Sequence, residues 1–112
     1  MKKILLSLFF IIALCSFLRA QDIEGSYASG TDKFVFTKSG NHYLFEAFDK
    51  GVKYSEGFAY YNSEYKRIIF IFQRTDNQNS GYGNFKVEGN KITGNTLNPD
   101  LSERWKGSFT KE

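Results

Sequence analysis

His42 is the only histidine in this 112-residue sequence, and histidine is the side chain best suited to acid–base catalysis near neutral pH. As a general base it would have to activate a nucleophile, and serine hydroxyls are available. No Gly-x-Ser-x-Gly segment occurs, however, and His42 lies at the edge of a predicted hairpin, where exposed histidines are ordinary. We therefore expect a surface histidine and no catalytic residue, which favours a binding or structural role over an enzymatic one.

A second candidate for chemistry is the polar run at residues 76–81. Acidic and amide oxygens followed by glycine at the sixth position are typical of a calcium-binding loop, but such a loop needs a bidentate acid at position twelve. That position is Val87, and Glu88 comes one residue late. We expect a solvated hairpin loop, with no bound metal and no cofactor.

Aromatic and acidic side chains alternate in a third segment, where Tyr54, Glu56 and Tyr60 share one phase of a strand. If that face is interior, these residues and Trp105 bound an aromatic pocket in which the carboxylate orients a ligand. Burial would also raise the pKa of that carboxyl. The alternative is a bulge close to Gly57 that leaves Glu56 outside.

The segment 68–72 is apolar without alternation, which predicts a strand covered on both faces. Another sheet, a terminal segment or a partner subunit would provide the cover, so Ile69 and Ile71 are candidate interface residues. Tyr61 and Tyr65 lie at the adjacent hairpin end, where tyrosine beside small polar residues makes a good recognition surface. The alternative for these tyrosines is an ordinary hairpin rim.

The elements that must position these residues are strands, because helical periodicity is nearly absent. Eight strands are predicted, at residues 23–29, 33–38, 41–48, 52–61, 66–74, 82–88, 91–96 and 104–110. Short turns rich in Gly and Asn join most of them, and such turns connect antiparallel neighbours. The sequence therefore predicts an all-β protein forming a small eight-stranded antiparallel up-and-down barrel, with a two-sheet β-sandwich as the alternative.

The first predicted strand opens with Gly25-Ser26-Tyr27, which resembles the calycin group, the lipocalin and avidin type of up-and-down barrel. That group begins with glycine, any residue and an aromatic ring, and a basic residue near the end packs across the ring. The resemblance implies that Tyr27 supplies the ring and Arg104, beside Trp105, supplies the cation. The group's usual Trp and its common disulfides are absent, so no biotin or lipid site is implied.

Residues 1–20 have the layout of a secretory signal peptide. Lys2 and Lys3 precede an apolar run, and Ala20 offers a small residue for cleavage. We expect an exported protein, periplasmic or extracellular, with one domain at 21–112. Lipidation of Cys15 is the alternative, disfavoured because Leu14 stands where a lipoprotein signal carries a small residue.

Charge argues against a nucleic-acid partner. The whole chain has 15 basic and 12 acidic residues, but three of the basic ones and none of the acidic ones precede residue 21. The expected mature domain is therefore neutral, without the basic surface that nucleic acids require. Most predicted strands are also shorter than the 9–11 residues, roughly, of an outer-membrane barrel, so we expect no transmembrane segment.

Two functions from different classes remain open. The first is an exported, non-enzymatic binding module for a small apolar ligand or a protein partner, with candidate ligand contacts at Tyr27, Tyr54, Glu56, Tyr60, Arg104 and Trp105. The second is a structural, oligomeric envelope protein that uses the strand at 67–74 as its subunit interface.

Overall fold

The computed structural model describes residues 22–112, which form eight β-strands and no helix. The strands are β1 (Gly25–Ser29), β2 (Asp32–Ser39), β3 (His42–Asp49), β4 (Val52–Asn62), β5 (Arg67–Arg74), β6 (Ser80–Glu88), β7 (Lys91–Leu97) and β8 (Glu103–Lys111). All eight predicted strands are present, with boundaries within two residues of those expected. The expected signal peptide and Cys15 lie outside the described residues.

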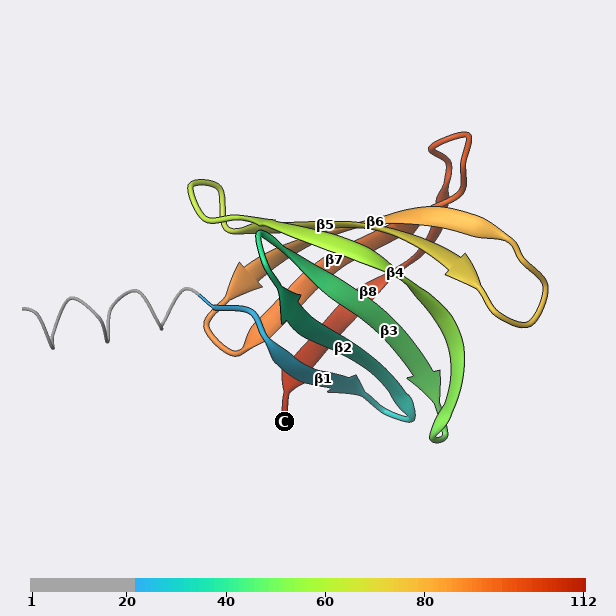
Figure 1. Cartoon of the computed structure of the whole chain (residues 1–112), viewed down its shortest axis with the longest axis horizontal. Coiled ribbons are helices and arrows are strands. Elements are labelled where there is room, and N and C mark those ends of the chain that lie inside the picture. The colour runs from blue at the N-terminus through green and yellow to red at the C-terminus, as the bar shows by residue number, and fades with distance from the viewer. Residues whose placement is uncertain (1–21) are drawn as a thin grey trace, which may run out of the picture.

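Each strand pairs antiparallel with the next one in sequence, and β8 closes the ring by pairing with β1 (Figure 1). Closure rests on two residue pairs, Tyr27 with Lys111 and Ala28 with Thr110. A two-sheet sandwich would leave its sheet edges unpaired. The predicted up-and-down barrel is therefore confirmed. None of the residues from 22 onward belongs to a helix that could span a membrane.

Phenylalanine rings fill the middle of the barrel. Phe34 on β2 stacks on Phe109 on β8, with ring centroids 4.0 Å apart, and Phe45 on β3 stacks on Phe70 on β5 at 4.2 Å. Phe85 on β6 lies 5.7 Å from both Phe34 and Phe70. Because alternate residues of a strand point inward, the rings from these strands all lie in the same central layer. Aromatic pairs of this kind add about 0.5–1.5 kcal/mol each beyond the burial of area.

Strand β5 alternates in the structure although its sequence does not. Ile68 and Phe70 are buried inside the barrel, whereas Ile69 and Ile71 are 50% and 52% exposed on its outer surface. Residues 22–112 provide no second sheet or terminal segment over this outer face, and cover by a partner subunit stays a prediction. In a closed single-layer barrel every strand has one inner and one outer face, and a strand's apolar residues do not determine what covers the outer one.

The end of the barrel reached first by the chain is closed. Its interior contains Ile23, Tyr27, Tyr43, Ile68 and Ile92, all buried. The Tyr27 hydroxyl donates to the carbonyl of Ile23 at 2.9 Å, and the Tyr43 hydroxyl donates to Oδ1 of Asp22 at 2.9 Å. These bonds tie the segment before β1 across the opening, so little space is left at this end.

The cation that packs on Tyr27 is Lys111, whose Nζ lies 5.8 Å from the ring centroid. The expectation that Arg104 has this role is wrong, because Arg104 lies near the beginning of β8 whereas β1 pairs with the end of that strand. The Cζ of Arg104 lies instead 5.4 Å from the ring centroid of Phe72.

The inner face of β6 has to stay free of bulk beside Phe70. Gly83 is the cross-strand partner of Phe70, and a Cβ on Gly83 would overlap the ring. We expect Gly83→Ala to displace the ring and lower the free energy of unfolding by about 1–3 kcal/mol in urea denaturation. Asn84→Ala, at the next and exposed position of the strand, should change it by less than about 0.5 kcal/mol. Equal effects of the two variants would contradict this account.

Candidate functional site

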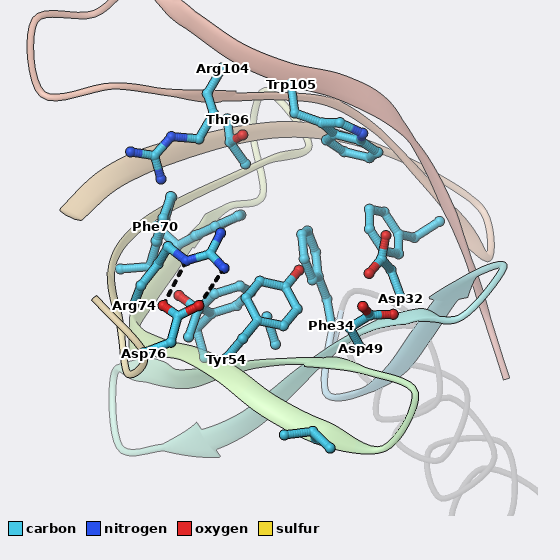
Figure 2. Close-up of a pocket in the computed structure, with 16 residues that line it drawn as sticks. Asp32, Phe34, Asp49, Tyr54, Phe70, Arg74, Asp76, Thr96, Arg104 and Trp105 are labelled. Carbon is cyan, nitrogen blue, oxygen red and sulfur yellow. Dashed lines mark hydrogen bonds and ion pairs between the residues drawn. The ribbon is translucent and has the colours of Figure 1, made fainter. Parts of the chain in front are cut away.

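A pocket of about 490 Å³ opens at the other end of the barrel (Figure 2). This mouth is surrounded by the turns and loops that join β1 to β2, β3 to β4, β5 to β6 and β7 to β8. The pocket lies directly above the central layer, because its floor consists of the core rings Phe34, Phe45, Phe70, Phe72 and Phe109. The mouth pocket is therefore an extension of the barrel interior.

Small side chains explain why the interior is not filled at this level. Ala47, Ser55 and Thr96 are buried in the wall of the mouth pocket, on β3, β4 and β7. One layer further in, β3 carries the larger Phe45, and the phenylalanine rings of the central layer fill the barrel. An eight-stranded barrel is just wide enough for its side chains to fill, so small residues in one layer leave a hollow.

A β-bulge directs Tyr54 into the mouth pocket. Ala47 pairs with Ser55 and Phe48 pairs with Lys53, so Tyr54 is an extra residue on β4 without a partner on β3. Both Tyr54 and Ser55 consequently line the pocket. Burial, and then the charge of the Asp32 carboxylate, raise the pKa of Tyr54 to about 12 although Arg74 opposes the shift. The hydroxyl stays protonated at physiological pH and offers both a donor and an acceptor.

Two guanidinium groups lie on one side of the mouth. Arg74 forms a bidentate pair with Asp76, with Nε–Oδ1 at 2.9 Å and Nη2–Oδ2 at 2.7 Å, and its Cζ lies 5.1 Å from the ring centroid of Tyr54. Arg104 donates from Nε to Oδ1 of Asn98 at 2.8 Å and from Nη2 to the carbonyl of Ser80 at 3.2 Å. The loops after β5 and β7 thus hold both groups in place.

Two carboxylates lie on the other side. Asp32 and Asp49 are direct cross-strand partners on β2 and β3, and the Thr31 hydroxyl donates to Asp49 at 2.8 Å. Burial, and then the charge of Asp49, raise the pKa of the Asp32 carboxyl above its ordinary value. Like charges placed directly opposite one another destabilise a strand pair. Neither carboxylate forms an ion pair within residues 22–112.

Trp105, the only tryptophan, completes the lip of the mouth pocket. Its ring lies 5.4 Å from Phe109 and 6.4 Å from Phe85, yet the residue is 37% exposed. An aromatic ring held on one side by the core and open on the other is well placed to contact a bound molecule. Its fluorescence would report occupancy of the pocket.

The predicted contact residues are divided among three places. Tyr54, Arg104 and Trp105 come together at the mouth pocket, while Tyr27 is buried near the closed end. The bulge at Tyr54 inverts the phase of β4, so Glu56 and Tyr60 lie on the outer surface, where Glu56 pairs with Lys53 at 2.7 Å.

Sequence reasoning missed three charged residues at strand ends around the mouth, Asp32, Asp49 and Arg74, and considered Asp76 only as part of a calcium loop. The available signal was their position at strand ends that flank the turns of one barrel end. Only a topology shows that those turns meet. Within the described part of the chain, no group of three or more His, Cys, Asp or Glu side chains is arranged to hold a metal ion.

A second candidate surface is the outer apolar face, formed by the exposed residues Leu44, Phe58, Tyr60, Ile69, Ile71 and Tyr82 on β3 to β6. A groove of about 700 Å³ lies in this region. Of the predicted interface residues, Ile69 and Ile71 belong to this face and Tyr65 is exposed in the β4–β5 turn. Tyr61 is half-buried against the core.

Fold and site together define a small closed antiparallel β-barrel with a pocket at one mouth, an architecture consistent with the calycin group in general. The sequence matches no protein-family model, and no curated protein is significantly similar to it.

The raised pKa of Asp32 predicts how the stability of the fold depends on pH. The folded state retains the proton to higher pH than the unfolded chain, so ionised Asp32 destabilises the fold at neutral pH and the penalty vanishes below the ordinary value of 3.8. We expect Asp32→Asn to raise the melting temperature at neutral pH and to lose this advantage near about pH 3.

Asp100→Asn is the matched control, because hydrogen bonds from Ser102 hold the pKa of Asp100 below its ordinary value. This variant should gain no stability at neutral pH. A lower melting temperature for Asp32→Asn at neutral pH would show that the ionised Asp32 carboxylate does not destabilise the fold.

Proposed function

We propose that this protein is an exported, non-enzymatic binding module that holds a small apolar ligand in its mouth pocket. The observation that carries the proposal is a pocket of about 490 Å³ whose floor is made of phenylalanine rings. Ligand sites are typically concave, mostly apolar and supplied with a few polar groups that set orientation. The mouth pocket has each of these properties.

Two further observations support a calycin-type interpretation. A basic side chain from the last strand, Lys111, packs over the ring of Tyr27 in the Gly-x-aromatic segment of the first. The barrel is also closed at one end and open at the other, as a ligand container must be. Export follows from the residue pattern of the first twenty positions. Fold analogy by itself does not define a ligand, so the proposal rests on the pocket.

A neutral dye tests the pocket directly. We expect N-phenyl-naphthylamine to bind the domain at 21–112 in a one-to-one ratio, with energy transfer from Trp105 to the dye. Thr96→Phe should weaken this binding about tenfold or more, because the added ring fills the pocket, and a tenfold loss corresponds to about 1.4 kcal/mol. The measurement is a fluorescence titration.

Thr93→Phe is the matched control, since Thr93 lies on the exposed outer face of the same strand, β7. It should leave dye binding unchanged, and thermal unfolding should establish that both variants are folded. If dye binding is retained in Thr96→Phe but lost in Ile71→Lys, the dye binds at the outer surface and the proposal is overturned.

A second function, self-association, is favoured by the order of side chains on the outer apolar face. Cross-strand pairing sets Glu46 beside Glu56 in one row, and Arg67 beside Lys86 in another. The two rows between them carry the six residues of the outer apolar face. Each charged row has one excess charge, because Lys53 pairs with the two glutamates and Glu88 pairs with Lys86.

This order makes the face complementary to itself. A two-fold axis lying in the interface and perpendicular to the strands would stack β5 of one copy on β5 of the other. The acidic row of each copy would then lie over the basic row of its partner, with Glu56 on β4 diagonally opposite Arg67 on β5, and Ile69 of one copy would meet Ile71 of the other. Closed two-fold dimers are the commonest soluble oligomers, and they need such a self-complementary patch.

Charge exchange tests this arrangement by sedimentation velocity over a range of concentrations. We expect a dimer that Glu56→Arg or Arg67→Glu weakens about tenfold each, because like charges then face one another. The double variant restores opposite charges across the interface and should recover the affinity. Ile71→Lys should abolish the dimer while Thr93→Lys, on the outer face of β7, should not. A monomer at all concentrations, or a double variant weaker than both singles, would exclude this interface.

A further inference from the structure

Binding of an apolar molecule does not account for the charges around the mouth pocket. Figure 2 shows Arg74 and Arg104 on one side of the pocket and Asp32 and Asp49 on the other, with the rings of Phe34 and Tyr54 between them. No ion pair within the described residues crosses the pocket; Arg74 pairs with Asp76 on its own side. The two sides are therefore oppositely charged poles separated by aromatic surface.

The positive pole has N–H donors that no described residue uses. Both partners of Arg104, the amide oxygen of Asn98 and the carbonyl of Ser80, are neutral, so its charge is not compensated. Asp76 occupies Nε and Nη2 of Arg74. Nη1 of each guanidinium forms no hydrogen bond to any residue from 22 to 112. Two oriented guanidinium groups with open N–H donors match a carboxylate, which can accept from both.

The negative pole has carboxylate oxygens that accept few hydrogen bonds from the described residues. Thr31 supplies a single hydroxyl donor, to Asp49. The nearby Lys33 is engaged by Glu112 at 3.1 Å. The two carboxylates face one another across adjacent strands without a cation between them. An ammonium group, with three donors and a positive charge, would relieve that repulsion.

We propose that the mouth pocket binds a small zwitterion, whose carboxylate lies against Arg104 and Arg74, whose ammonium lies against Asp32 and Asp49, and whose apolar body rests on Phe34 and Trp105. This inference rests on the proposed function, because it uses the same pocket. A fatty acid would leave the aspartates uncompensated, and an amine or metal ion would leave Arg104 uncompensated. A short peptide with apolar side chains carries both charges at its ends and presents apolar surface between them.

Chemical capping of one peptide separates the contributions. The probes are phenylalanyl-leucine, its N-acetyl form, its C-terminal amide and the doubly capped form, each titrated by calorimetry and by Trp105 emission. We expect the free dipeptide to bind best and each single cap to weaken binding about tenfold or more, since a tenfold change is about 1.4 kcal/mol. The capping series uses the unaltered protein, so it does not depend on any variant folding.

Two variants assign the poles. Arg104→Gln should weaken binding of the free dipeptide but not of the amide, because the amide lacks the charge that Arg104 recognises. Asp32→Asn should weaken binding of the free dipeptide but not of the N-acetyl form. Thermal unfolding shows that both variants are folded, and the retained affinity for the corresponding capped peptide shows that the pocket is intact.

Each outcome bears on the inference separately from the proposed function. Equal affinity for all four peptides, or no binding of any of them, overturns the zwitterion assignment. If the neutral dye still binds in the pocket, the proposed function stands without it. If dye and peptides both fail to bind, both conclusions fall.

Discussion

The contact between phenylalanine rings at the barrel axis is the interaction on which the rest of the structure depends. Closure between β1 and β8 involves only two residue pairs, too few to hold a cylinder together by backbone pairing alone. Phe34 and Phe109 come from β2 and β8, the strands on either side of β1, and their stacking spans that short junction. Without cysteine in the described domain, no disulfide can replace this packing.

The same packing determines where the protein can interact with other molecules. Aromatic rings fill the middle of the barrel, and isoleucines and tyrosines occupy one end. The pocket of the interior lies at the mouth, where Ala47, Ser55 and Thr96 are small. Charges that the chain does not compensate internally collect at that mouth. Repulsion between Asp32 and Asp49 costs stability, and the ligand that we propose for the mouth pocket would supply the missing partner.

Most of the fold could be predicted because hairpins are local. Turn residues and alternation specify strand ends and neighbours over about ten residues, and they predict all eight strands in their observed order. It was harder to predict which side chains of β4 and β5 point into the barrel. One extra residue at Tyr54 inverts the phase of β4 and moves Glu56 from the expected interior to the surface. Ile69 and Ile71 are apolar yet exposed, and the type of a side chain does not by itself determine whether it is buried.

The sequence by itself determined the strand count, the antiparallel order and the aromatic character of the core, because these depend on periodicity and on turn chemistry between neighbours. It also predicted one pocket bounded by Tyr54 and Trp105, but it placed Glu56 and Tyr60 there as well. Only the tertiary structure decided that Asp32, Asp49, Arg74 and Arg104 surround one mouth and that Lys111 packs on Tyr27. The physical reason is that ring closure brings together strand ends far apart in the chain, and neither register shifts nor closure contacts leave a local signature in the sequence.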